Sequence, residues 1–105
     1  MFGRFLHRVY DRILKRLREC VRSRNYIVTL DADEEMAEEG ISILDVERAK
    51  FEGRIIERQK DENRTEWKYL VAGPTRHADS ITAVTKIGST GKMILITVFG
   101  DDSQE

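Results

Sequence analysis

The sequence is poor in the residues that mark disulfide-rich, fibrous or membrane-spanning proteins. It has one cysteine, Cys20, and one proline in 105 residues. A lone cysteine excludes an internal disulfide and no ligand pattern surrounds it, so we expect a reducing, cytoplasmic compartment. No apolar run approaches the roughly 18 residues of a transmembrane helix. Arginines interrupt the N-terminal segment throughout, so it has no apolar core of the kind found in a secretory signal.

Charged residues, by contrast, are abundant. They make up 35% of the chain, and hydrophobic residues make up 40%, which suits a modest core. We therefore expect a single domain over residues 1–105. Residues 1–24 carry a net charge of +6 and residues 25–105 a net charge of −7. This asymmetry indicates that the basic segment binds a polyanion, binds an acidic surface of a partner protein, or docks on the acidic remainder of its own chain. The internal docking is favoured, because helices of small domains usually bury their apolar face within the same domain.

The first 24 residues predict a basic amphipathic helix. Apolar residues recur at helical spacing over residues 2–23. Arginines form a second row four residues apart, and like charges at this spacing repel one another, which indicates an anionic neighbour. A solvated face near the acidic body is favoured over a nucleic-acid contact. The candidates for binding RNA or a partner are Arg4, Arg8, Arg12 and Arg16.

Two short helices are expected over residues 31–52, after a short extended stretch at residues 26–30. The signals are acidic or hydroxyl caps at the helix starts and glycines at the ends. They are Asp31 with Glu34, Gly40, Ser42 with Asp45, and Gly53. The acidic run that begins at Asp31 lacks the glycine position and the ligand spacing of a calcium loop, so a capped, solvated helix is favoured.

After Gly53 the hydrophobic period changes to that of strands. Four strands with short links form an antiparallel meander, and helices followed by strands indicate an α+β fold. The strands cover residues 54–60, 66–73, 80–87 and 93–99, with links at 61–64, 73–79 and 88–91. The glycine-rich stretch Gly88-Ser-Thr-Gly91-Lys92 is similar to a phosphate-binding loop, but such a loop opens a helix and here a strand follows. A hairpin turn is therefore favoured. His7 and His77 lack companions at ligand spacing, and we expect no metal and no cofactor.

Cations, an amide and aromatic residues alternate along two neighbouring strands. Alternation places Arg54, Ile56, Arg58 and Lys60 on one face and Glu57 and Gln59 on the other, then Glu66 with Lys68 and Trp67 with Tyr69 on opposite faces. Lys86 and Lys92 add cations from the later strands. Such a set suits a phosphate and a base. Ion pairs of Glu57 or Glu66 with cations on neighbouring strands are the favoured alternative.

The same residues belong to a set of stretches shared with a known family. They are Tyr26-Ile-Val-Thr-Leu30 with Ala32, Glu34-Glu-Met-Ala37, Gly40-Ile-Ser-Ile-Leu-Asp-Val46, Gly53-Arg-Ile-Ile-Glu-Arg-Gln59 with Asp61, Glu66-Trp-Lys-Tyr-Leu-Val71, Lys86-Ile-Gly88 and Thr90-Gly-Lys-Met-Ile-Leu-Ile-Thr-Val98. Over about residues 13–99 the chain resembles the bacterial and archaeal family catalogued as domain of unknown function 4258. That family is similar in fold to the RelE-like toxins, including the MqsR branch, and its members often lie beside antitoxin genes.

The resemblance implies N-terminal helices packed on a four-stranded antiparallel sheet and a metal-independent endoribonuclease of a type II toxin–antitoxin pair. It implies RNA and a cognate antitoxin as partners, with a homodimer as a further option. The implied catalytic residues are Arg58, Gln59, Lys68, Tyr69 and Lys86. In these roles the two lysines hold the phosphate, Tyr69 stacks on a base or donates a proton, Gln59 reads a base edge, and Arg58 neutralises the transition state.

The chain departs from the family pattern at three positions. Asp31 replaces the histidine of a His-Ala pair, Glu39 replaces an arginine, and Phe99 replaces an aromatic hydroxyl. Asp31 is therefore a candidate base or a helix cap, and the cap is favoured. The alternative function is a catalytically silent member of this fold that binds a protein partner through its helices. A third option is attachment of the basic helix to a membrane surface.

Overall fold

The computed structural model describes residues 2–60, 66–75 and 79–100, with side chains from Arg8 onward. The helices are α1 (Phe2–Arg22), α2 (Leu30–Glu39) and α3 (Ile43–Glu52). The strands are β1 (Tyr26–Val28), β2 (Arg54–Lys60), β3 (Trp67–Pro74), β4 (Ser80–Ile87) and β5 (Met93–Gly100). These bounds confirm the predicted helices and place each predicted strand within one residue. The predicted link at residues 61–64 lies outside the described residues, and so do residues 76–78 of the predicted link at residues 73–79.

The sheet has five strands in the order β1-β5-β4-β3-β2. Strands β2 to β5 form the predicted antiparallel meander, and the hairpin between β4 and β5 is closed by a hydrogen bond from the Gly88 amide to the Lys92 carbonyl at 2.8 Å. The prediction of four antiparallel strands was nevertheless wrong. The short stretch Tyr26–Val28 is a fifth strand that runs parallel to β5, which makes the sheet mixed. Pairing there satisfies backbone groups that would otherwise form an open edge beside β5.

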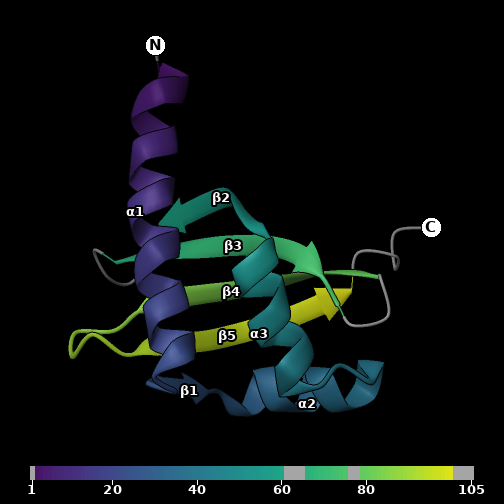
Figure 1. The fold of residues 1–105 in the computed structure, drawn as a ribbon. Helices are drawn as coiled ribbons and strands as arrows, with labels where there is room; N and C mark the ends of the chain where they lie inside the picture. Colours follow the sequence, from purple (N-terminus) through teal and green to yellow (C-terminus); the bar gives the residue numbers. More distant parts are fainter. Residues whose placement is uncertain (1, 61–65, 76–78, 101–105) are drawn as a thin grey trace.

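One face of this sheet is covered by helices. Figure 1 shows α1 and α3 lying across the same side, with α2 along the edge near β5. Residues from α1 and from the starts of β3 and β5 form one buried cluster, which includes Leu17, Val21, Tyr69, Val71 and Met93. Residues from α2, α3, β4 and β5 form a second, which includes Met36, Val46, Ile81, Leu95 and Val98. We call this side the helix face; the opposite side, which no described helix covers, is the open face.

The start of α2 is fixed by Thr29, not by Asp31. The Thr29 hydroxyl accepts a hydrogen bond from the Ala32 amide at 3.2 Å and donates one to the Ile96 carbonyl at 2.9 Å. The Thr29 amide also donates to the Leu95 carbonyl at 3.1 Å. The predicted Asp31 cap was therefore wrong, because β5 holds Thr29 in the cap position and leaves Asp31 exposed in the first turn.

The other helix ends follow the sequence signals. Gly40 ends α2 with a φ of 68°, a left-handed conformation that glycine adopts without strain. Ser42 and Asp45 form a capping box at the start of α3. Gly53 follows its last turn, with its amide bonded to the Ala49 carbonyl at 2.7 Å.

Helix α2 also covers the part of β5 that lies beyond β1. The carboxylate of Glu35 accepts hydrogen bonds from the Val98 amide and the Thr97 hydroxyl, and that of Glu39 accepts one from the Gly100 amide at 3.0 Å. Carboxylates thus satisfy the amides of a strand edge that has no neighbouring strand. None of the described helices is long and apolar enough to span a bilayer.

Candidate functional site

A β-bulge in β2 divides the residues that the sequence grouped together. Ile55 pairs with Val71 and Glu57 pairs with Leu70, so Ile56 is an extra residue between them. The bulge reverses the alternation on its N-terminal side. Arg54, opposite Ala72, therefore lies on the open face, whereas Arg58 and Lys60 lie on the helix face. The predicted grouping of all three with Ile56 on one face was wrong.

The five candidate catalytic residues also fall on two faces. Arg58 pairs with Tyr69 on the helix face, where the Tyr69 side chain belongs to the core and its residue is only 6% exposed. The Arg58 guanidinium carbon lies 4.2 Å from the centre of the Trp67 ring, which is a cation–π contact. Gln59 pairs with Lys68 on the open face. The structure therefore separates Arg58 and Tyr69 from the remaining candidates.

Gln59, Lys68 and Lys86 lie at one level of the open face, on the adjacent strands β2, β3 and β4. Tyr69 pairs with Thr85 on the helix face, so the next residues along these strands, Lys68 and Lys86, lie near each other on the open side. Both lysines are half-buried and Gln59 is exposed. The structure therefore brings together two cations and an amide from three separate strands.

Carboxylates lie beside this group. The Lys86 Nζ is 3.0 Å from Glu66 Oε1, and the two side chains are 17% and 30% exposed. The Gln59 amide donates to Glu57 Oε2 at 3.0 Å. The predicted ion pair of a glutamate with a lysine is thus confirmed for Glu66. Among the described residues Lys68 has no ion-pair partner, so its charge is available to an anion.

Apolar residues continue the open face toward the other end of the strands. They are Leu70 on β3, Val84 on β4 and Phe99 on β5, of which Phe99 is 38% exposed, while Ile94 on β5 lies opposite Lys86. An apolar floor with lysines at one end offers surface for a base and charge for a phosphate. Phe99 supplies ring area there but no hydroxyl.

The other predicted residues lie away from this face. Asp31 is on α2, outside the edge of β5, and strands β5 and β4 lie between it and the strand of Lys68. The described arginines of the α1 row are exposed and lie on the helix side of the sheet. They are Arg8, Arg12 and Arg16. The structure therefore does not bring Asp31 or these arginines to the lysines.

Lys50 is a titratable residue that the sequence analysis did not single out. It lies on α3, is fully buried, and its Nζ donates to the Thr85 hydroxyl at 2.7 Å. Burial lowers the pKa of Lys50 to about 7. The Arg18 guanidinium donates to the carbonyls of Lys50 at 2.9 Å and Gly53 at 3.1 Å, and so binds the last turn of α3 to α1. Helical spacing from Val46, on the buried side of α3, was the available signal for Lys50.

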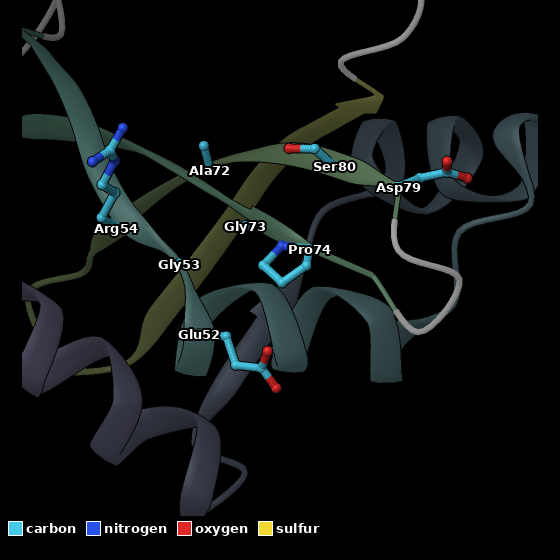
Figure 2. Close-up of a pocket in the computed structure, with 8 residues that line it drawn as sticks. All are labelled: Glu52, Gly53, Arg54, Ala72, Gly73, Pro74, Asp79 and Ser80. Carbon is cyan, nitrogen blue, oxygen red and sulfur yellow. The ribbon is translucent and has the colours of Figure 1, made fainter.

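A hollow of about 400 Å³ lies at the opposite end of the sheet from Lys68. It is lined by Glu52, Gly53, Arg54, Ala72, Gly73, Pro74, Asp79 and Ser80. Figure 2 shows the charged side chains of Glu52, Arg54 and Asp79 pointing in different directions rather than toward a common centre. Among the described residues no group of histidine, cysteine and acidic side chains has a metal-binding arrangement. The hollow therefore offers no convergent set of catalytic groups.

Comparison with known proteins places the chain in a family. The family profile described as "Domain of unknown function (DUF4258)" matches residues 28–100. No curated protein and no solved structure matches the sequence. The match covers most of the chain, including α2, α3 and strands β2 to β5. The chain therefore belongs to the DUF4258 family.

Proposed function

We propose that this protein is a metal-independent endoribonuclease of the toxin type, with a RelE-like arrangement of helices and sheet, and that RNA binds on the open face. The observation that carries the proposal is the convergence of Lys68, Lys86 and Gln59 from three adjacent strands. Two ammonium groups at this spacing suit a phosphodiester, whose charge would offset their mutual repulsion. A cognate antitoxin is the proposed protein partner.

The proposed reaction is attack of the ribose 2′-hydroxyl on the adjacent phosphorus. A bond forms between the 2′-oxygen and phosphorus while the bond to the 5′-oxygen breaks, which gives a 2′,3′-cyclic phosphate and a 5′-hydroxyl end. Negative charge develops on the non-bridging phosphate oxygens. The Lys68 ammonium, which has no ion-pair partner among the described residues, would stabilise that charge.

Glu66 is the proposed general base. Its carboxylate shares the open face with Lys68 and is held by Lys86 at 3.0 Å, so its position is fixed. It would accept the proton of the 2′-hydroxyl, and the leaving 5′-oxygen would take a proton from solvent at this exposed face. Gln59 would contact a base edge, and the apolar floor near Leu70 would contact a base ring. The proposal gives no direct role to Tyr69, which is buried on the other face.

The test is cleavage of a labelled single-stranded RNA by the purified protein in the presence of a chelator, with and without ribosomes. Lys68→Ala is expected to lower the cleavage rate at least about tenfold, which is roughly 1.4 kcal/mol of barrier. Glu66→Gln is expected to lower it by a similar factor. The products are expected to carry a 2′,3′-cyclic phosphate.

Lys92→Ala is the matched control. Lys92 is an exposed cation beside the β4–β5 hairpin, outside the group of three, so its removal changes net charge equally and is expected to leave the rate within about twofold. Absence of cleavage both with and without ribosomes would contradict the proposal. Equal losses in Lys68→Ala and Lys92→Ala would contradict the assigned site but not the activity.

A further inference from the structure

Only the C-terminal half of α1 is packed into the body of the protein. Leu17 and Val21 are buried, whereas Tyr10, Ile13 and Leu14 are partly buried at the rim of the same cluster. Arg8 and Val9, the described side chains that precede Tyr10, belong to neither buried cluster. Figure 1 shows the first turns of α1 extending past β2 and clear of the sheet. The N-terminal half of α1 is therefore a projecting helix.

The projecting half combines cations with a continuing apolar pattern. Arg8 and Arg12, followed by Lys15 and Arg16 on the next turn, are exposed and form no ion pair with the described residues. Asp11 is the one acidic residue in the sequence before Glu19. The sequence extends the apolar row of the packed half to the helix start with Phe2, Phe5, Leu6 and Val9. A helix with arginines beside an apolar row of phenylalanine and leucine has the composition of helices that lie in a lipid interface.

The charges of the molecule are arranged along its length. Figure 1 places the start of α1 and helix α2 at opposite ends. The exposed side chains of α2 include five acids, Asp31, Asp33, Glu34, Glu38 and Glu39. An anionic surface would therefore attract the α1 end and repel the α2 end, so the molecule would approach it with α1 first.

From these observations we infer that the projecting half of α1 binds the surface of an anionic lipid bilayer. The apolar row would enter the boundary between headgroups and acyl chains, and the arginines would contact lipid phosphates. The packed half, held by Leu17 and Val21, would keep the sheet outside the bilayer. This inference is independent of catalysis on the open face, because α1 lies on the other side of the sheet.

The apolar row favours lipid over nucleic acid as the anion. RNA offers phosphates to cations and bases to single aromatic rings, but it provides no continuous apolar environment for a row that includes the aliphatic residues Leu6 and Val9. A lipid interface accommodates both the cations and the row. The lipid inference therefore explains why the apolar pattern continues to Phe2 although the first turns of α1 project past β2.

The test is sedimentation of the full chain with sucrose-loaded vesicles. Vesicles of phosphatidylcholine with about one third phosphatidylglycerol are compared with vesicles of phosphatidylcholine alone, at near-physiological salt. We expect binding to the anionic vesicles at least tenfold stronger than to the neutral ones. The double variant Arg8→Glu with Arg12→Glu is expected to lose at least tenfold in this binding, and so is Phe5→Ser with Leu6→Ser, which leaves the charge unchanged.

The matched control is Arg48→Glu with Lys92→Glu, which changes net charge equally at exposed positions outside α1 and is expected to keep most of the binding. Failure to sediment with anionic vesicles would overturn the inference. An equal loss in the control variant would also overturn it, because net charge alone would then explain the binding. Unchanged binding by the Phe5 and Leu6 variant, or stronger binding of α1 to a single-stranded RNA that displaces the vesicles, would assign the arginines to a polyanion other than lipid.

Discussion

The two faces of the sheet hold lysines in opposite environments. On the helix face Lys50 is fully buried, its Nζ is bonded to the Thr85 hydroxyl at 2.7 Å, and its pKa is lowered to about 7 by burial. On the open face Lys68 and Lys86 are half-buried, and Glu66 pairs with Lys86. Thr85 and Lys86 are neighbours in the chain, so one step along β4 separates the two environments.

The difference shows that lysine has two distinct roles in this fold. Lys50 lies inside the core with its Nζ bonded to the Thr85 hydroxyl, where its charge is disfavoured and its chain fills volume. Lys68 is half-buried on the open face, where an anion can reach it. Face, rather than residue type, therefore decides which lysine affects stability and which one is suited to bind a ligand.

The largest effect is expected from Lys50→Met. The folded pKa of Lys50 is about 7, against an ordinary value of 10.5. Between these pH values the unfolded chain holds a proton that the folded chain lacks, so the free energy of unfolding rises with pH in this window and is flat below it. Removal of the buried amine should raise the free energy of unfolding by about 2 to 4 kcal/mol at pH 7. Urea unfolding from pH 6 to 9.5 measures this gain, which should shrink as pH rises.

Lys68→Met is the control for this comparison, because it removes the same charge from the open face. It is expected to change the free energy of unfolding by less than about 0.5 kcal/mol. A gain in Lys50→Met that is constant from pH 6 to 9.5 would contradict a neutral buried lysine in the folded state.

The next largest effect is expected from Gly73→Ala on β3. A Cβ at Gly73 would lie 2.4 Å from the Ala49 carbonyl oxygen, so α3 would have to move away from the sheet. We expect a loss of about 2 to 3 kcal/mol in the free energy of unfolding. Its neighbour Ala72 faces the open side, and Ala72→Ser should cost less than about 1 kcal/mol. Thermal unfolding of both variants measures the contrast. Equal losses of stability in the two variants would contradict the view that only the helix face is closely packed at this position.

A smaller effect is expected from Thr29→Ala, which removes the true cap of α2. The cap hydrogen bond and the bond to the Ile96 carbonyl are both lost, and the cost should be about 1 to 2 kcal/mol. Asp31→Asn, at the position that the sequence pattern marked as the cap, should change stability by less than about 0.5 kcal/mol. Chemical denaturation distinguishes the two, and a reversed order would restore Asp31 as the cap.

The smallest effect is expected from Lys86→Met on the open face. Its ion pair with Glu66 is partly exposed, so removal should cost no more than about 1 kcal/mol and the cost should fall at high salt. RNA affinity should fall more than stability does, because the proposed phosphate contact depends on this charge. Comparison of unfolding and RNA binding at low and high salt measures both, and a stability loss larger than the binding loss would contradict the assignment.

Local signals in the sequence predicted the helices and most strand bounds. Gly40, the Ser42 and Asp45 capping box, and the Gly88 to Gly91 turn depend on conformational preferences of a few adjacent residues, so they were predictable. The bulge at Ile56 was not predictable. The extra residue leaves the alternating pattern in the sequence intact, but in space it exchanges the faces on which the side chains before the bulge lie. That bulge decided where Arg54 lies relative to Arg58.

The candidate site was predictable in composition but not in arrangement. Of the five predicted residues, Gln59, Lys68 and Lys86 lie on the open face, whereas Tyr69 is buried and Arg58 covers the Trp67 ring on the other face. Which face the helices cover is a property of the whole fold, so period-two alternation alone assigns residues to faces without saying which face is open. The burial of Lys50 was missed for the same reason.

The sequence by itself determined the α+β class, the basic amphipathic helix and the caps of α3, because these follow from side-chain periodicity and local backbone preference. Only the tertiary structure decided that Tyr26–Val28 joins the sheet parallel to β5, that Thr29 rather than Asp31 caps α2, and that Lys50 is enclosed while Lys68 is accessible. Each of these depends on contacts between segments far apart in the chain. The free energy that favours each arrangement therefore comes from packing in the whole fold rather than from any local stretch of residues.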